Sequence, residues 1–254
     1  MPARQLRWLL IGNSRWHWAL DGADGGGGDA PLRFLHLPPP TAVGDPPLAW
    51  AAVGPVPPQA GLPAATRLEL KNVPLAEVPP WLGIDRALAG WWAARLTGGP
   101  VLVADAGTVL SLTRVDGRGR FAGGRLMAGA ALQLGAMASG TQGLPSLEEG
   151  LSAGGGGDAW PKATDAAMRR GVAEGLAAAV LEAGRQARAL EPGCRIVLTG
   201  GDGPTLMPLL QHASELGEGV LMHCPDLCLE ALVALRPRPP VGGVAQASPR
   251  SSRI

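Results

Sequence analysis

Several kinds of residue are scarce in this sequence, and each scarcity excludes a class of protein. Only three cysteines occur in 254 residues, too few for the disulfide framework of a secreted protein. Basic and acidic residues nearly balance, at 22 against 21, so no positive field favours nucleic acid or an anionic membrane. No apolar run approaches the roughly 20 residues of a membrane span, and residues 1–10 lack the pattern of a signal peptide. We therefore expect a cytoplasmic protein that binds neither nucleic acid nor membrane.

The common nucleotide and hydrolase motifs are also missing. The two lysines, Lys71 and Lys162, do not follow a glycine loop, which excludes a P-loop. Residues 117–122 match G-x-G-x-x-A by letter, but the residues that follow do not open a helix, so we interpret this segment as a hairpin turn. No Gly-x-Ser-x-Gly elbow is present. A metal site at Cys224 and Cys228 would lack a second pair of ligands.

An internal repeat of one structural unit is present. Residues 7–11 form an apolar run that ends in a Gly-Asn-Ser turn, and residues 16–20 then alternate between large apolar and other side chains. The same pattern recurs from residue 101, where an apolar run over 101–104 leads into the turn at 105–108 and an alternating segment follows. The two turn glycines, Gly12 and Gly107, stand 95 positions apart, which predicts two similar lobes. The alternative is that glycine turns recur by chance in a glycine-rich chain.

Helices and one further strand complete the expected α/β pattern. Apolar side chains recur at helical spacing over residues 84–96 and 164–190. Residues 195–198 predict a strand that leads through Gly200 and Gly201 toward another helix. A strand that ends in a glycine turn before a helix is a phosphate or ribose platform in many α/β folds.

Glycine- and proline-rich segments suggest how the chain is divided. Three segments have the composition of loops or insertions: residues 25–28, 38–63 and 154–157. We expect a first lobe over residues 1–96, with its loops at 22–66, and a second lobe over 97–235. The tail at 236–254 is too poor in apolar residues to pack, so we expect it to be disordered.

Seven short motifs follow one another along the chain: Gly12-Asn13-Ser14, Gly83-Ile84-Asp85-Arg86, Asp105-Ala106-Gly107-Thr108, and residues 123–129, 141–145, 198–202 and 225–230. In this order and spacing they resemble the type III pantothenate kinases, and the match extends to about Leu235. The resemblance implies an α/β fold of duplicated RNase H-like (actin-like ATPase) lobes with a cleft between them. That fold agrees with the internal repeat.

The resemblance implies ATP-dependent phosphorylation of pantothenate to 4'-phosphopantothenate, the first step of coenzyme A biosynthesis. It also implies a homodimer that requires Mg²⁺ and a monovalent cation, K⁺ or NH₄⁺. Two alternatives stay open. One is a non-catalytic relative that binds nucleotide or pantothenate and acts through a protein partner, and the other is a kinase of a different small alcohol, such as a sugar.

Roles for individual residues follow from the same resemblance. The motif Gly83, Ile84, Asp85 and Arg86 is similar to the pantothenate-binding element, and Asp85 to its proton acceptor. Thr164 is similar to a threonine that contacts pantothenate. Because the family completes this site across its dimer, the resemblance implies that Thr164 acts from the neighbouring subunit. Asp105 is similar to the monovalent-cation ligand. The first phosphate loop, one hydroxyl and the second glycine turn are expected to bind ATP: Leu10, Ile11, Gly12, Asn13, Ser14, Arg15, Trp16, His17, Thr108, Gly200 and Gly201.

Physical chemistry supports these roles and offers plainer alternatives. A carboxylate beside a primary alcohol can accept its proton during phosphoryl transfer, and the start of a helix keeps Asp85 ionised. Asp85 and Thr164 would also serve as ordinary helix N-caps. Arg86 suits a carboxylate or phosphate, or else lies on the surface of its helix.

The first phosphate loop departs from the family pattern. Most members have Asp-x-Gly-Asn-Thr, whereas here Leu10 stands in place of the aspartate. In the 95-residue repeat Leu10 lies opposite Asp105, so one of two related carboxylates is missing and with it a contact to hydrated Mg²⁺. Trp16 and Trp18 are expected to pack on the face of their strand, and His17 to point to solvent.

Overall fold

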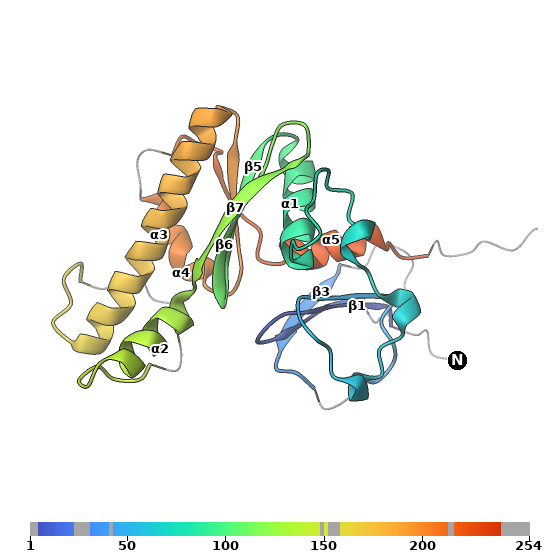
Figure 1. Ribbon diagram of the computed structural model, residues 1–254, viewed down its shortest axis with the longest axis horizontal. Helices are drawn as coiled ribbons and strands as arrows, with labels where there is room; N and C mark the ends of the chain where they lie inside the picture. Colours follow the sequence, from blue (N-terminus) through green and yellow to red (C-terminus); the bar gives the residue numbers. More distant parts are fainter. Residues whose placement is uncertain are drawn as a thin grey trace, which may run out of the picture.

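A computed structural model of the chain describes residues 5–22, 31–40, 43–147, 150–151, 158–212 and 216–239 (Figure 1). Two of the predicted loops, residues 25–28 and 154–157, lie outside the described residues. The same holds for residues 240–254, most of the tail predicted to be disordered.

The first sheet is formed by the N-terminal part of the chain. Its strands are β1 (Arg7–Ile11), β2 (Trp16–Leu20), β3 (Arg33–Leu37) and β4 (Ala49–Ala52). They lie in the order β3-β2-β1-β4, with β2 antiparallel to its neighbours and β4 parallel to β1. A single parallel bridge between Trp50 and Arg67 extends the sheet beyond β4.

Strand β4 corrects the prediction that residues 38–63 form only a loop. Between the prolines of this segment, residues 48–53 are apolar, and β4 is buried next to β1. Proline is excluded from a central strand but not from its flanks. A short buried strand can therefore lie inside a segment whose overall composition is that of a loop.

The second sheet repeats the strand order of the first. Its strands are β5 (Val101–Ala106), β6 (Val109–Val115), β7 (Phe121–Ala128), β8 (Arg195–Thr199) and β9 (Leu221–His223). The order is β7-β6-β5-β8-β9, with β5 to β7 antiparallel and with β8 and β9 parallel to β5. The predicted α/β fold of duplicated, RNase H-like lobes is confirmed by these two sheets. The interpretation of residues 117–122 as a hairpin turn is also confirmed, because they connect β6 to β7.

Helices lie on both faces of the second sheet (Figure 1). Helices α1 (Ile84–Thr97) and α5 (Leu227–Leu235) lie between the two sheets, and their apolar residues share one core with both. The opposite face of the second sheet is covered by α2 (Ala130–Gly140), α3 (Thr164–Leu190) and α4 (Gly203–Gln211). Three short 3₁₀ helices connect β4 to α1: Pro58–Ala60, Ala64–Thr66 and Leu70–Asn72.

The long helix α3 shows why the sequence predicts some elements well. Its bounds match the predicted range, and Met168, Val172, Leu176 and Val180 lie on one buried stripe. This stripe packs on the second sheet. None of the helices in the described part of the chain is both long and apolar enough to cross a membrane.

Candidate active site

The two glycine turns of the repeat meet in the folded chain. The first connects β1 to β2 and the second connects β5 to β6. The hydroxyl oxygens of Ser14 and Thr108, one from each turn, lie 2.8 Å apart and share a hydrogen bond. Within the first turn, the Gly12 N–H donates to the carbonyl of Arg15 at 3.0 Å. Two predicted phosphate-binding turns are thus joined side chain to side chain.

Two carboxyl groups face the space between the sheets. Asp105 is on the same face of β5 as Val101 and Val103, which pack toward α1 and α5. Asp105 is half-buried at the end of β5, where the Gly200 turn packs against its carboxyl. Burial, reinforced by the charge of Asp85, raises the pKa of Asp105 to about 7. Asp105 therefore carries a proton in part of the molecules near neutral pH.

Asp85 is the second residue of α1 and has an unused oxygen. Its Oδ1 is buried and has no hydrogen-bond partner among the described residues. Burial raises the pKa of this carboxyl, although N–H groups at the helix start and the Arg86 guanidinium oppose the rise. The N-cap of α1 is Gly83, so the alternative in which Asp85 caps the helix is wrong. A Cβ on Gly83 would lie 2.5 Å from Asp85 Oδ1, so the glycine leaves room for this side chain.

Cys228, in the first turn of α5, forms another side of the same cluster. Its Sγ lies 3.5 Å from the backbone carbonyl of Asp85, as a weak thiol donor. Burial, together with the charges of Asp105 and Asp85, raises the pKa of the thiol well above its ordinary range. The sulfur is consequently a neutral thiol and not a nucleophilic thiolate.

The turn between β8 and α4 closes on the end of β5. Gly200 has a φ of 90°. A Cβ at this position would lie 2.5 Å from the carbonyl oxygen of Ala106 and 2.6 Å from Asp105 Oδ1. Position 200 therefore requires glycine on both conformational and steric grounds. The next residue, Gly201, is exposed.

Arg86 is anchored to the second sheet. Its Nε donates to Thr113 Oγ1 at 3.0 Å, and its guanidinium lies 5.8 Å from the centre of the Phe121 ring. Burial lowers the pKa of Arg86, while the neighbouring Asp85 raises it. The alternative of a surface arginine is wrong, because β6 and β7 hold this side chain beside Asp85.

Thr164 is not brought to this cluster within one chain. It is the exposed first residue of α3, on the opposite face of the second sheet from α1. Ala163 occupies the N-cap position, so the alternative that Thr164 is the cap is wrong.

The remaining residues of the first loop separate into core and surface. Leu10, Ile11 and Trp16 are buried, whereas Asn13, Ser14 and Arg15 are exposed. Trp16 and Trp18 pack in one apolar cluster, as predicted.

The prediction that His17 points to solvent is wrong. Its ring is half-buried, and its Nδ1 lies 2.7 Å from the Nδ1 of His36. The sequence reasoning missed His36 because it did not predict β3. The four apolar residues among positions 32–37 were the available indication of that strand.

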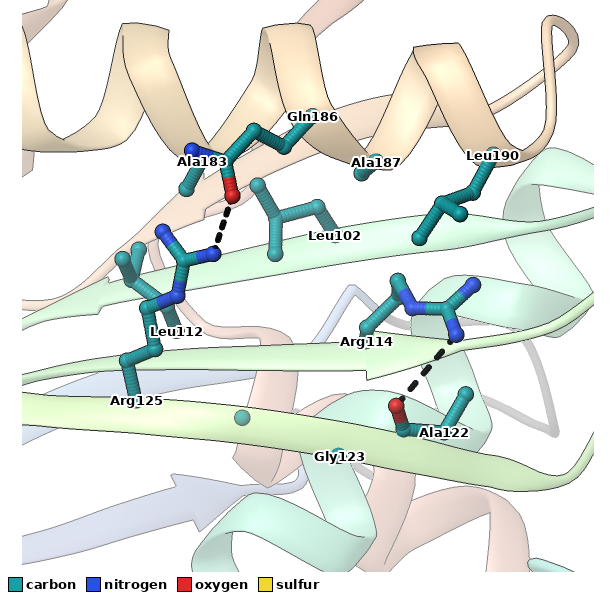
Figure 2. Close-up of a pocket in the computed structure, with 11 residues that line it drawn as sticks. Leu102, Leu112, Arg114, Ala122, Gly123, Arg125, Ala183, Gln186, Ala187 and Leu190 are labelled. Carbon is teal, nitrogen blue, oxygen red and sulfur yellow. Dashed lines mark hydrogen bonds between the residues drawn. The ribbon is translucent and has the colours of Figure 1, made fainter.

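A shallow pocket elsewhere is not part of this site. It has a volume of about 240 Å³ and lies between α3 and the strands β5, β6 and β7 (Figure 2). Its two arginines already have partners: Arg125 donates to Gln186, and Arg114 lies 2.9 Å from Glu191 Oε2. The pocket is on the face of the sheet opposite to α1.

The donor set limits how a metal ion can be held. Among the described residues, no three His, Cys, Asp or Glu side chains gather in an arrangement that would hold a metal ion. Mg²⁺ in phosphoryl-transfer sites is usually held by one or two carboxylates together with substrate phosphates and water. Asp105, with Asp85 beside it, fits that pattern and does not fit an all-protein metal cage.

Comparison with known proteins gives the same family. The family model for type III pantothenate kinase matches residues 62–186. A type III pantothenate kinase from Synechococcus elongatus is 37% identical, over 89% of this chain and 96% of its own length. One from Synechococcus sp. (strain JA-3-3Ab) is 36% identical, over 93% of this chain and 95% of its own. Among solved structures, the ethanolamine utilization protein EutJ from Carboxydothermus hydrogenoformans aligns over 93% of this chain and 90% of its own, with 12% identity and a TM-score of 0.47. On the relatedness of the sequences, the chain belongs to the type III pantothenate kinase family.

Proposed function

We propose that this chain transfers the γ-phosphoryl group of ATP to the hydroxyl of pantothenate, giving 4'-phosphopantothenate and ADP, the first step of coenzyme A biosynthesis. Family membership supports the reaction. The observation that carries it in the structure is the buried Asp85 Oδ1, which has no hydrogen-bond partner in the described part of the chain and lies in the same region as the two joined turns. This oxygen is the acceptor that a substrate hydroxyl needs.

Asp85 is the proposed general base. A primary alcohol is a weak nucleophile until a carboxylate takes its proton, and the raised pKa of Asp85 makes it a better acceptor at neutral pH. The substrate would be bound by the motif at residues 83–86, with Arg86 facing its carboxylate or the transferred phosphoryl group. Arg86 suits this role because Thr113 and Phe121 fix its orientation.

The turns are the proposed phosphate-binding elements. Their backbone N–H groups and the hydroxyls of Ser14 and Thr108 would contact ATP, together with Gly200 and Gly201. Phosphoryl transfer depends mainly on positioning and on neutralising charge. Mg²⁺ supplies that neutralisation when bound, and Asp105 is the proposed ligand of the monovalent cation, K⁺ or NH₄⁺.

We further propose that the active form is a cytoplasmic homodimer, in which each chain has lobes at residues 1–96 and 97–235. Thr164 is too remote to serve the Asp85 of its own chain, which supports its action on the site of a neighbouring chain. Exposed apolar residues on β7 and α2 support a dimer surface there, since Leu126 is 61% exposed and Leu132 is 46% exposed.

The test is ADP release by the purified chain with ATP and Mg²⁺, in the presence and absence of pantothenate and of K⁺. Turnover is expected to need both, and Asp85→Asn is expected to reduce kcat at least about a hundredfold, with an unchanged melting temperature. Asp165→Asn, an exposed aspartate at the same position of α3, is the matched control.

One observation favours a second function. Because Leu10 replaces a carboxylate, the chain could bind nucleotide or pantothenate without transferring phosphate. ATP binding without turnover on pantothenate or other small alcohols would support that non-catalytic reading and contradict the kinase. Turnover on a sugar but not on pantothenate would identify a different acceptor.

A further inference from the structure

The first sheet has a row of side chains that begins at position 10. Leu10 of β1 is paired with His17 of β2, and His17 is paired with His36 of β3. Residues directly opposite each other on adjacent strands point to the same face of a sheet. An imidazole therefore stands next to the strand position that carries Asp105 in the second sheet and Leu10 in the first.

The row continues to the start of α5. The rings of His17 and His36 are 5.0 Å apart between centroids and meet edge to face, with their Nδ1 atoms 2.7 Å apart. His36 Nε2 lies 3.0 Å from Oδ1 of Asp226, the N-cap residue of α5. The angles of this last contact are outside those of a hydrogen bond, so we treat it as an electrostatic contact between the carboxylate and the Nε2–H dipole.

This arrangement favours one tautomer for each of the two imidazole rings. A carboxylate 3.0 Å from His36 Nε2 favours the tautomer with the proton on that nitrogen, and in this tautomer Nδ1 of His36 is an acceptor. His17 must then donate its Nδ1–H to His36, and its Nε2 retains a lone pair. Burial, followed by the effects of His36 and Arg15, lowers the pKa of His17 to about 4, so the ring is neutral at pH 7.

The unprotonated nitrogen points at the first turn. A Cβ built on Gly12 would lie 3.0 Å from His17 Nε2 and 3.1 Å from the carbonyl oxygen of Arg15. Because Gly12 has no side chain, the imidazole of His17 has room to lie against the turn. A neutral acceptor here has an advantage over a carboxylate, because it adds no negative charge beside phosphates.

We propose that His17 is the acceptor of the first turn, as Asp105 is of the second, and that its Nε2 accepts a hydrogen bond from the water shell of nucleotide-bound Mg²⁺. His36 and Asp226 are positioning residues that fix the tautomer of His17. This inference rests on the proposed function, since it assigns a residue to the nucleotide site of the same reaction.

The first test is calorimetric binding of ADP to the full chain, with Mg²⁺ and with EDTA. His17→Ala is expected to weaken Mg²⁺-dependent binding about tenfold and EDTA-condition binding less than about twofold, because one hydrogen bond to a charged shell is lost. Asp226→Asn is expected to cause a smaller loss in the same direction. His212→Ala, which removes the exposed histidine at the C-cap of α4, is the matched control and should bind like wild type.

A rescue separates the chemistry from a structural effect. In Leu10→Asp/His17→Ala the acceptor returns on the neighbouring strand, and Mg²⁺-dependent binding is expected to recover. Melting temperatures of all variants show whether they are folded. Equal losses with Mg²⁺ and with EDTA, or no loss, would overturn the inference.

The second test needs no variant and no turnover. Nitrogen NMR of the chain labelled at its four histidines should show His17 neutral, with the proton on Nδ1. A proton on Nε2 of His17 would overturn the inference even if the kinase reaction is demonstrated. Absence of any nucleotide binding would instead overturn the proposed function, and this inference with it.

Discussion

The two hairpin turns occupy the same place in sheets of the same strand order, yet they distribute their polar groups differently. In the second sheet the first strand carries Asp105, and its neighbours in register are Ser111 and Thr199. In the first sheet the same position is Leu10, and the polar group is one strand further out, at His17. The two sheets thus share a backbone arrangement, but the titratable side chain lies on the first strand in the second sheet and on the adjacent strand in the first sheet.

The two turns also differ in how tightly they are packed and in the charge around them. Asp105 is crowded by Asp85, Cys228 and the Gly200 turn, and its pKa is raised for that reason. The chain after β4 contacts the first turn through its backbone, where Val53 N–H donates to the carbonyl of Ile11 at 2.9 Å, but a Cβ on Gly54 would have no described atom within 4 Å. One turn is tightly packed and acidic, and the other is open and neutral.

The largest difference between the turns should come from glycine replacements behind them. Gly200→Ala is expected to lower the free energy of unfolding by about 3 kcal/mol, because a positive φ and a clash with the Ala106 carbonyl combine. Gly54→Ala is the matched variant behind the first turn and should change it by less than about 0.5 kcal/mol. Denaturant unfolding measures both, and equal losses would contradict the asymmetry.

An intermediate effect is expected from the pH dependence of stability. The ordinary pKa of an aspartate is 3.8, and that of Asp105 in the folded chain is about 7. Between these values the folded state holds a proton that the unfolded state has released, so stability falls as pH rises through this window and levels off above it. In Asp105→Asn the fall in melting temperature between about pH 5 and about pH 8 should be smaller than in wild type. Leu10→Met, at the equivalent position of the first turn, should keep the wild-type slope, and a wild-type slope in Asp105→Asn would refute the assignment.

The smallest effect concerns the contact that joins the turns. The hydroxyl pair of Ser14 and Thr108 is exposed, so its coupling should be only about 0.5 to 1 kcal/mol. A double-mutant cycle of Ser14→Ala and Thr108→Ala measures it by unfolding. Ser14→Ala combined with Ser139→Ala, an exposed serine of α2, should be additive. If the first pair is additive too, the turns are not coupled through their hydroxyls.

Local patterns were sufficient to predict the repeated hairpins and the long helices. Apolar runs that end in glycine turns mark β1 and β5, and helical periodicity marks α1 and α3. Strand β7 could not be predicted in this way, because its Phe121–Ala128 segment is rich in glycine and mostly exposed, and it shows no alternation. Helix α5 is short and apolar on nearly every side, so periodicity alone does not distinguish it from a buried strand.

The site was predictable to the extent that it lies next to recognisable turns. Asp85, Asp105, Ser14 and Thr108 follow from motifs, and the fold brings them to one region. The partners of His17 could not be found from motifs, because cross-strand register and the start of a distant helix determine them. Sequence alone does not specify register when a strand is not foreseen.

The position of α5 determines when the first sheet can complete its core as the chain is synthesised. Residues 7–20 are synthesised before the other described elements, but α5, made more than 200 residues later, covers the face of β1 and β2. The indole N–H of Trp8 donates to the carbonyl of Arg236 at 2.7 Å, which joins the earliest strand to the end of that helix. The first sheet therefore cannot complete its core until α5 has been synthesised, and its apolar face lacks this cover until then.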